Sequence, residues 1–406
     1  MPKCLVLAPF PLSLPRHGGQ VRVASMLRAG EMAGWQMFPV GVFHAAFFPK
    51  EEWGADDIVV EDSALQKLAL DDMAFADLHI ARWTAADEGT KEKLRVLLRR
   101  IAPDIIQVEH PWTWLLLREV LPADNKIRIV YSSHNLEWAA RKPLLKLSLQ
   151  NASSEAMLEA TRLLEERFAR TADLVISISD VEGEEIARSS GRRVVHMPAV
   201  SDMSQDAPVS PRFAKEARSL SCRYAALMGS AYWPNVEGFF SLFPEGLGFL
   251  PRGEQLWIGG TLSKALREDD RFKIFESINE SRSRILGYID DSEKSGFLGS
   301  AECVIVPVQI GAGSKLKTVD AIVSGRPVVA TSHAIEGYGA AVRPAIGNGL
   351  YIADTPKEFR SYIRQAMRGG LAGCSDAVRN SLRLGALSHV WNGEMRQLLS
   401  SGASST

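Results

Sequence analysis

The chain has 406 residues, of which 46% are hydrophobic, and because this is more than one ordinary core holds, two domains of roughly 200 residues are expected. Its 47 basic and 48 acidic residues are interspersed and leave a formal net charge of −1, which disfavours nucleic acid as a partner. The four cysteines lie far apart and form no Cys-x-x-Cys pair, a pattern typical of a reduced, cytoplasmic protein rather than of a disulfide framework or a zinc site.

The N-terminus leads directly into an apolar run at 3–10, with no charged leader and no cleavage site before it. No apolar run in the chain is long enough to cross a bilayer. The sequence therefore predicts a soluble cytoplasmic protein that at most rests on the inner surface of the cell membrane.

The first half of the chain alternates short β-forming runs with longer helical patterns. The runs predicted as strands are 3–10, 37–43, 104–109, 127–133, 173–179 and 193–198. Such alternation is typical of a parallel sheet with helices on both faces. Residues 1–200 are therefore predicted to form one Rossmann-like, doubly wound α/β domain.

A polar segment with prolines at 201–217 shows no apolar periodicity and is interpreted as a linker. A second alternating series follows it. Its predicted strands are 224–230, 255–260, 283–289, 302–308, 327–331 and 350–354. This series predicts a second Rossmann-like domain over 218–375, and apolar residues at helical intervals predict a terminal helix within 376–406 that can pack back on the first domain.

A glycine-rich loop joins a predicted strand to a helix in the stretch PVQIGAGSKLKTVDAIVSG at 307–325. Gly311 and Gly313 allow the backbone to lie close to a ligand, and the amides of Ser314 and its neighbours begin the helix. Unpaired amides and the positive end of the helix dipole form an anion site. Because Lys315 adds a full positive charge, the loop suits a phosphate or a diphosphate.

Asp320 borders the apolar stripe of this helix, since it lies only about 40° from Leu316 on a helical wheel. A carboxylate in that position needs donors, and the hydroxyls of a ribose or another sugar would supply them. The alternative is an ordinary strand-loop-helix connection in which Asp320 pairs with Lys317. The loop is neither a P-loop nor a GxGxxG fingerprint, so nucleotide hydrolysis and nicotinamide binding are both disfavoured.

With "SGRPVVAT" and "HAIEGYG" after it, this loop resembles the donor-binding region of retaining family 4 glycosyltransferases, also called glycosyl transferases group 1. Further similar stretches are "PFPLSLPRHGGQVRV", "SSHNLEWAARK", "GSAYWPNVEGFFSLFP" and "ILGYIDD". The resemblance extends over about residues 3–340. It implies the GT-B fold, in which two Rossmann-like domains face each other across a cleft, with the acceptor domain first and the nucleotide-sugar donor domain second.

The resemblance also implies roles for individual residues. His134 contacts the transferred sugar and, with Lys315, is expected to be catalytic. The donor is expected to be held by Gly18, Gly19, Asn235, Tyr288, Gly311, Gly313, Ser314, Lys315 and Asp320. Tyr288 lies in the stretch that frames the nucleotide base, and Asp320 takes the ribose hydroxyls. Ala312 and Asp320 stand where the family often carries a pair of glutamates.

His134 follows the predicted strand 127–133 at its carboxyl end, where open α/β sheets bind ligands. Glu137 and Arg141 are four residues apart and are expected to form an ion pair that orients the loop of His134.

Glu109, His110 and Trp112 follow another strand end. They are candidates for contact with a sugar acceptor, because aromatic faces stack on sugars. The alternative is a helix start with half-buried tryptophans.

A basic helix over KEKLRVLLRRIAP could touch anionic lipid, or it could present an ordinary solvated face. The acidic doublets at 71–72, 269–270 and 290–291 lack a DxD context after a strand. Neither an essential metal nor a cofactor is therefore expected, because lysine and backbone amides can neutralise the diphosphate.

Taken together, these features predict an enzyme that moves a sugar from a nucleotide-sugar donor to a saccharide or lipid-linked acceptor. The resemblance implies retention at the anomeric carbon and a role in bacterial surface or exopolysaccharide biosynthesis. Two alternatives stay open: a sugar-nucleotide epimerase of the same architecture, and a catalytically silent subunit that only binds sugar nucleotides.

Overall fold

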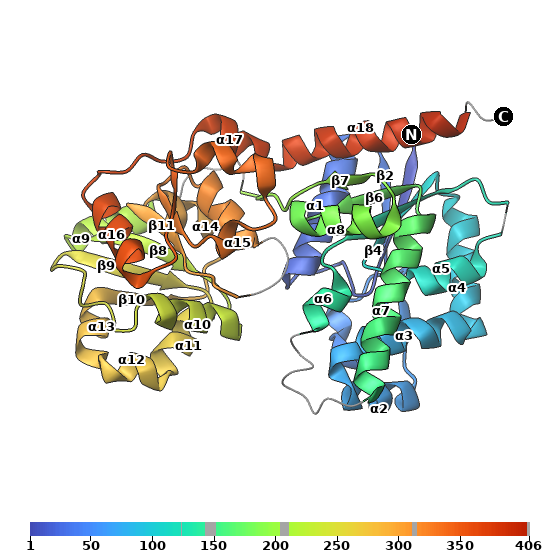
Figure 1. The fold of residues 1–406 in the computed structure, drawn as a ribbon, viewed down its shortest axis with the longest axis horizontal. Coiled ribbons are helices and arrows are strands. Elements are labelled where there is room, and N and C mark those ends of the chain that lie inside the picture. The colour runs from blue at the N-terminus through green and yellow to red at the C-terminus, as the bar shows by residue number, and fades with distance from the viewer. Residues whose placement is uncertain (123, 143–151, 204–210, 311–314, 404–406) are drawn as a thin grey trace. The chain divides into compact units, whose positions relative to one another are not determined.

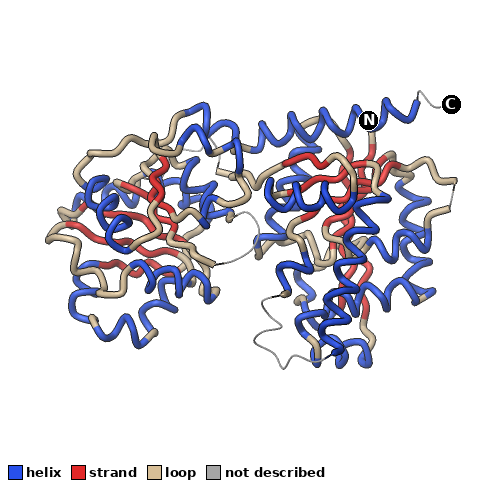
Figure 2. The backbone as a smooth tube through the Cα atoms, viewed as in Figure 1, coloured by secondary structure: helices blue, strands red, loops and turns tan. Residues whose placement is uncertain are grey.

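The computed structural model describes residues 1–122, 124–142, 152–203, 211–310 and 315–403, which divide into two compact units (Figure 1). Unit 1 consists of Met1–Pro198 and Leu387–Thr406, and unit 2 consists of Ala199–Ala386. Each unit contains one parallel sheet, and Figure 2 shows helices flanking the strands of both. The predicted fold class, two doubly wound α/β domains, is confirmed.

The sheet of unit 1 has seven strands in the order β3-β2-β1-β4-β5-β6-β7. The strands are β1 Lys3–Ala8, β2 Gln36–His44, β3 Ile58–Val60, β4 Ile105–Glu109, β5 Arg128–Ser133, β6 Leu174–Ser177 and β7 Val194–His196. Successive strands are added to one side of β1 and then, from β4 onward, to its other side. The β1/β4 boundary is therefore the topological switch point of unit 1, where open α/β sheets bind ligands.

The helices of unit 1 connect these strands and cover the sheet. They are α1 Gly18–Met32, α2 Ser63–Asp71, α3 Ala76–Ala86, α4 Glu88–Ile101, α5 Trp114–Val120, α6 Glu137–Arg141, α7 Ala152–Thr171 and α8 Asp180–Ser190, with the 3-10 turns η1 Ala45–Phe47, η2 Lys50–Glu52 and η3 Met73–Phe75. Most of α18, Leu384–Ala403, also belongs to this unit. Trp391 of α18 is completely buried and its indole donates to Gln107 of β4 over 2.8 Å, so the end of the chain completes the core of unit 1.

The sheet of unit 2 has six strands in the order β10-β9-β8-β11-β12-β13, with its switch point between β8 and β11. The strands are β8 Arg223–Met228, β9 Glu254–Gly259, β10 Ser283–Gly287, β11 Cys303–Val306, β12 Val328–Ala330 and β13 Leu350–Ile352. The helices are α9 Arg212–Ser219, α10 Trp233–Leu242, α11 Leu262–Glu268, α12 Asp270–Ile274, α13 Glu276–Arg282, α14 Asp291–Gly299, α15 Leu316–Val323, α16 Pro356–Met367 and α17 Asp376–Ser381, with the 3-10 turns η5 His333–Ile335, η6 Gly339–Ala341 and η7 Arg343–Ala345.

Close packing at the β8/β11 switch point depends on a glycine. A Cβ atom at Gly238 of α10 would lie only 1.8 Å from the carbonyl oxygen of Pro307, which follows β11. Because no other residue fits there, Gly238 lets α10 lie directly against the end of β11. The N-terminus of α10 is thereby brought beside the start of the loop that leads to α15.

Three local features differ from the sequence predictions. Strand β3 was not predicted, because Ile58–Val60 is too short to show a period. Helix α9 begins inside the segment interpreted as a linker, since Phe213 is buried and its ring lies 5.2 Å from that of Phe297. The segment predicted as one terminal helix forms two helices, α17 and α18. Between them, the backbone of Arg383 forms an isolated β-bridge with that of Ser201.

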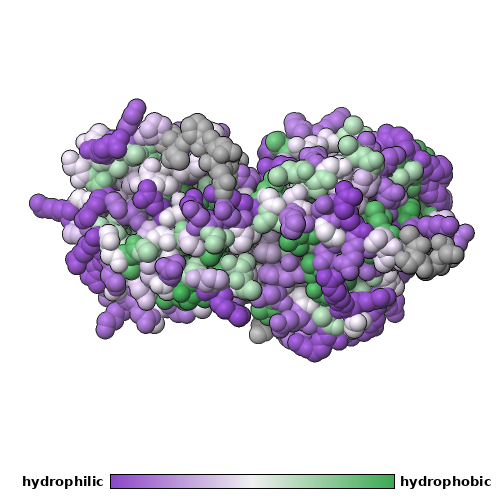
Figure 3. All heavy atoms as spheres, turned by 90° about the horizontal axis from the view of Figure 1, so that it is seen from above, coloured by the Kyte–Doolittle hydropathy of each residue, from purple (hydrophilic) through white to green (hydrophobic). Residues whose placement is uncertain are grey.

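The surface is mainly hydrophilic in the view of Figure 3, with apolar residues scattered between polar ones. Among the described helices, none is both long and apolar enough to span a membrane. On α4, Lys91 and Arg95 pair with Glu88, and Arg99 pairs with Glu92. Since these cations are neutralised within their own helix, α4 fits the solvated alternative better than a lipid-binding role.

Candidate active site

Polar side chains gather at the carboxyl ends of the strands in both units, close to each switch point. In unit 1 they follow β1, β4 and β5, and in unit 2 they follow β8 and β11. These are the positions at which open parallel sheets place their ligands.

In unit 1, His134 and Glu109 form a buried pair. Glu109 ends β4, His134 follows β5, and the two strands are neighbours in the sheet. The Nε2 atom of His134 lies 2.6 Å from Oε2 of Glu109, and the side-chain amide of Gln107 donates to Oε1 of the same carboxylate. Because Glu109 is 0% exposed, these donors are what make its burial tolerable.

The protonation of this pair follows from burial and from its neighbours. Burial, reinforced by the charge of His110, lowers the pKa of His134 to about 4. Burial is the largest single influence and would raise the pKa of Glu109, but the hydrogen bond and charge interaction with His134, together with the hydrogen bond from Gln107, outweigh it and hold that pKa below its usual value. At neutral pH, His134 is therefore a neutral imidazole beside an ionised Glu109.

His110 is held beside His134 by a second set of polar contacts. Its ring centroid lies 4.1 Å from that of His134, and its Nδ1 atom lies 2.8 Å from Oε1 of Glu137. Arg141 pairs with Glu137, and also with Asp77 at 2.8 Å. The predicted ion pair of Glu137 and Arg141 is confirmed, and Glu137 also contacts His110 beside His134.

Two of the three predicted acceptor contacts are buried. Glu109 is 0% and Trp112 is 3% exposed, and the guanidinium of Arg141 lies 4.7 Å from the centre of the Trp112 ring. The burial of both side chains disfavours direct contact with a sugar, and Trp112 instead fits the alternative of a helix start with buried tryptophans. Of the three, His110 keeps a partly exposed ring, with 12% of its side chain accessible.

Gly18 and Gly19 form the first turn of α1, near the same histidines. His17 caps this helix, with its Nδ1 atom accepting from the amide of Gln20 at 3.4 Å. The ring of Phe10 lies 5.0 Å from that of His17 and 5.7 Å from that of His110. These ring contacts bring the start of α1 beside the histidine pair at the β1/β4 switch point.

In unit 2, Lys315 is the N-cap residue of α15 and is only 9% exposed. Its Nζ atom lies 3.8 Å from Oε2 of Glu336, and its carbonyl oxygen accepts from the hydroxyl of Tyr338 at 2.8 Å. Gly311, Gly313 and Ser314, which were predicted to hold the diphosphate with it, lie outside the described residues.

Lys317, in the first turn of α15, is a functional candidate that the sequence analysis missed. Its ammonium group donates to Oδ1 of Asn235 in the first turn of α10, and the amide of Asn235 donates to the carbonyl of Ser230 over 2.9 Å. Burial, and then the charge of Lys315, lower the pKa of Lys317 to about 8. The signal that could have found it is the pair of lysines in one helical turn directly after a glycine loop.

Asp320 has partners other than the one considered from the sequence. Its Oδ1 atom accepts from the hydroxyl of Ser201 at 2.6 Å, and its Oδ2 atom lies 3.3 Å from Nζ of Lys294 in α14. Burial raises the pKa of Asp320, and Lys294 opposes this increase. The alternative pairing of Asp320 with Lys317 is therefore wrong, because Lys317 extends toward α10 instead.

Tyr288 follows β10 at the carboxyl edge of the same sheet and is 79% exposed, so one face of its ring is accessible to a ligand. Within the described ranges, no group of three or more His, Cys, Asp or Glu side chains could hold a metal ion.

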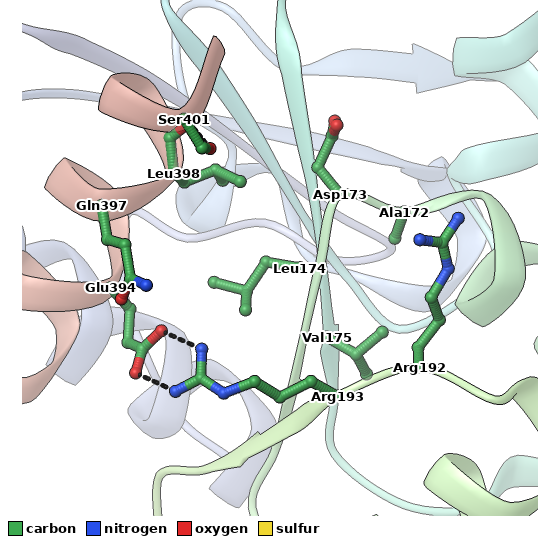
Figure 4. A pocket seen from close by; sticks show the side chains of 10 residues that line it. All are labelled: Ala172, Asp173, Leu174, Val175, Arg192, Arg193, Glu394, Gln397, Leu398 and Ser401. Atoms are coloured by element: carbon green, nitrogen blue, oxygen red, sulfur yellow. Dashed lines mark hydrogen bonds and ion pairs between the residues drawn. The ribbon is translucent and has the colours of Figure 1, made fainter. Parts of the chain in front are cut away.

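A separate pocket lies at the opposite edge of the unit 1 sheet, by the amino ends of β6 and β7 (Figure 4). Residues 172–175 and 192–193 line it, together with Glu394, Gln397, Leu398 and Ser401 of α18. The guanidinium of Arg193 forms two bonds to Glu394, and Arg192 donates to the carbonyl of Arg170. Because its arginines are already engaged, this pocket carries no obvious anion site.

Comparisons with known proteins agree with this arrangement. Residues 82–199 match the model of Glycosyltransferase Family 4, and residues 229–368 match that of Glycosyl transferases group 1, so that the two cover more than half of the chain. No curated protein matched the chain.

Several solved structures share its fold. Sucrose-phosphate synthase from Thermosynechococcus elongatus is 15% identical, with a TM-score of 0.66 and coverage of 99% of this chain and 100% of that one. The catalytic domain of starch synthase IV from Arabidopsis thaliana, bound to ADP and acarbose, is 12% identical with a TM-score of 0.61 and 99% coverage of both chains. A putative UDP-N-acetylglucosamine 2-epimerase from Listeria monocytogenes is 12% identical, with a TM-score of 0.54 and coverage of 98% and 97%.

The last structure shows that the fold alone does not separate a transferase from an epimerase. The family models separate the two, because both halves of the chain match glycosyltransferase families. The chain is therefore a GT-B glycosyltransferase of family 4, the glycosyl transferases group 1.

Proposed function

We propose that unit 2 binds the diphosphate of a nucleotide-sugar donor at Lys315 and Lys317, and that the enzyme transfers the sugar to a hydroxyl group of a saccharide or lipid-linked acceptor. The observation that carries this proposal is the meeting of two helix N-termini, those of α10 and α15, at one switch point with two lysines between them. The ADP named in the starch synthase structure supports a nucleoside diphosphate as the ligand.

The charge balance of the site favours an anion. Among the described residues, Lys317 donates to the side-chain oxygen of Asn235, which is a neutral partner. Burying an ammonium group without a counter-ion costs free energy. The positive charge of Lys315 increases this cost, because it repels the ammonium group of Lys317. A diphosphate would relieve this cost, because its oxygens would accept from both lysines.

The same groups would assist the reaction. As the bond between the anomeric carbon and the phosphate oxygen breaks, negative charge grows on the leaving diphosphate, where the fixed positive charges stabilise it. We propose that the acceptor hydroxyl attacks from the same face, so that its oxygen bonds to the anomeric carbon with retention and its proton passes to the leaving phosphate. The lysines take the place of a metal, so chelation with EDTA is expected to leave the turnover unchanged.

The remaining assignments follow the family resemblance. We propose that His134 contacts the transferred sugar, that Tyr288 stacks on the nucleotide base, and that Asp320 meets the ribose after exchanging the hydroxyl of Ser201 for that of the ligand. Four free cysteines among the described residues suit a reducing cytoplasm. The expected role is the assembly of bacterial surface or exported polysaccharide.

The experiment is to incubate the protein with UDP-, ADP-, GDP- and dTDP-linked sugars, with and without mono- and oligosaccharide acceptors, and to identify the products by mass spectrometry and NMR. A new glycoside that requires the acceptor supports the proposal. An isomerised nucleotide sugar formed without acceptor would support the epimerase, and binding without any product would support a silent subunit. Lys317→Met is expected to lower kcat/KM by about tenfold to a hundredfold, the value of one charged hydrogen bond, whereas the control Lys264→Met, at a side chain 79% exposed on α11, leaves it unchanged.

A further inference from the structure

A continuous line of hydrogen bonds runs from the C-terminal helix of unit 1 to His134. The indole nitrogen of Trp391 donates to Oε1 of Gln107 over 2.8 Å, and Nε2 of Gln107 donates to Oε1 of Glu109. The other oxygen of Glu109 lies 2.6 Å from Nε2 of His134. Trp391, Gln107 and Glu109 are all 0% exposed, so water does not compete for these bonds.

Each bond in this line has only one possible direction. An indole N–H can only donate, so the carbonyl oxygen of Gln107 faces Trp391 and its NH₂ group faces Glu109. An ionised carboxylate can only accept, so the ring nitrogen that faces Glu109 must carry a hydrogen. The chemistry of the partners, and not the observed position of a proton, therefore assigns the tautomer of His134.

We propose that Trp391, Gln107 and Glu109 are positioning residues that hold His134 as the neutral Nε2–H tautomer, so that its Nδ1 atom accepts a hydrogen bond from a hydroxyl group of the sugar. A phosphate oxygen is excluded as the partner of Nδ1, because Nδ1 in this tautomer and an ionised phosphate oxygen are both hydrogen-bond acceptors. The inference rests on the proposed function for the identity of the hydroxyl, but the tautomer itself is independent of it.

The charged and titratable groups around His134 keep its second nitrogen free of a proton. Glu109 is the only carboxylate that bonds to the ring among the described residues, and it is engaged through Nε2. His110, whose ring lies 4.1 Å away, and Arg22, which bonds to the carbonyls of Met197 and Pro198, both disfavour a positive charge on His134. Burial acts in the same direction.

Replacing Glu109 by glutamine gives a directional test. Gln107 still offers its NH₂ group, so the carbonyl oxygen of the new side chain must face Gln107 and its own NH₂ group must face His134. His134 Nε2 then becomes an acceptor, and the hydrogen moves to Nδ1. A role limited to packing would not invert the tautomer, because the two side chains have nearly the same shape.

Trp35 provides a matched control for Trp391. Its indole is 3% exposed, donates to Asn392 of α18 over 2.9 Å, and lies 5.1 Å from the ring of Trp391. Unlike Trp391, it makes no bond to Gln107. Trp35→Phe and Trp391→Phe therefore remove similar buried donors from the same part of unit 1, but only the second removes a link to His134.

The experiment records long-range ¹H–¹⁵N spectra of the full chain labelled with ¹⁵N-histidine at pH 7.5, with the signals of His134 assigned by their loss in His134→Gln. The wild-type protein and Trp35→Phe are expected to show the Nε2–H tautomer, and Glu109→Gln the Nδ1–H tautomer. In the double variant Glu109→Gln with Trp391→Phe, the side-chain amide of Gln107 is free to rotate, so both tautomers of His134 are expected. In the double variant Glu109→Gln with Trp35→Phe, only the Nδ1–H tautomer is expected.

A charged or Nδ1–H imidazole in the wild-type protein would overturn the proposal, and this result needs only the assignment variant His134→Gln to fold. An unchanged tautomer in folded Glu109→Gln would overturn it as well. With the nucleotide sugar that gives turnover in the panel described above, Glu109→Gln is expected to lower kcat by at least about tenfold with KM little changed. If no nucleotide sugar is turned over, the proposed function fails, while the spectra still decide the inference.

Discussion

At the scale of single residues, the structure adds Lys317 to the lysine that the sequence predicted. Lys315 was predicted from its place after the glycine loop, whereas Lys317 was considered only as a partner for Asp320. The sequence could not decide this, because the direction of a helical side chain depends on the helix packed against it. Asn235, which is far away in the sequence, draws Lys317 toward α10.

The lowered pKa of Lys317 predicts that nucleotide binding depends on pH. In the free protein this pKa is about 8, below the ordinary value of 10.5, so the group loses its proton as the pH rises through 8. A diphosphate bound as proposed would raise the pKa again, so that the complex would take up a proton. The affinity for UDP or ADP, measured by calorimetry, is therefore expected to fall between pH 7 and 9.5, and Lys317→Met to show weaker binding with a flatter profile. The same slope in Lys317→Met and wild type would contradict this assignment.

The buried imidazole of His134 makes the stability of the protein depend on pH in the acidic range. Its pKa in the folded protein is about 4, below the ordinary value of 6.5. Between these two values, the unfolded chain binds a proton at His134 and the folded chain does not. The free energy of unfolding should therefore decrease as the pH falls from about 6.5 to about 4, by up to about 3 kcal/mol from this group. In His134→Gln, urea unfolding should show a smaller decrease over this range, whereas a variant with an unchanged slope would argue against the neutral histidine.

At the scale of elements, the sequence predicted most strands well, because continuous apolar runs such as that of β1 mark buried parallel strands. It missed β3, which is three residues long, and α9, which rests on the single buried ring of Phe213. It also could not show that α10 and α15 begin side by side. That contact depends on the strand order, which no local pattern contains.

Gly238 is the position at which this helix arrangement is most easily tested. A methyl group there would meet the carbonyl oxygen of Pro307 at 1.8 Å, so Gly238→Ala must move α10 away from β11. The expected loss of stability is about 1 to 3 kcal/mol, read from urea unfolding, together with weaker binding of nucleoside diphosphate. Gly299→Ala, at a site where an added Cβ meets nothing within 4 Å, is the control. Equal effects of the two substitutions would contradict the packing described here.

At the scale of the whole molecule, the sequence predicted two domains. It predicted only that the C-terminal helix can pack back on the first of them. The structure groups residues 387–406 with unit 1, since Leu387, Trp391 and Met395 are buried there. The segment interpreted as a linker in fact begins with Ser201 and Asp202, which belong to unit 2 and contact Asp320 or its partner Lys294.

A truncation after Ala386 should therefore damage unit 1, although it removes only the end of the chain. It uncovers the apolar surface beneath Trp391 and leaves Gln107 without its indole donor. We expect a protein that aggregates, or that loses several degrees of Tm. A truncation after Ala403 is the control, and a stable, monodisperse protein from the longer truncation would contradict the role given to α18.

The most direct test of the account is a crystal structure of the protein with UDP or ADP. We predict that the diphosphate lies at the N-termini of α10 and α15, with its oxygens within hydrogen-bonding distance of Lys315 and Lys317. A nucleotide bound elsewhere, or a site in which Lys317 still bonds to Asn235 while the diphosphate lies away from both lysines, would contradict it.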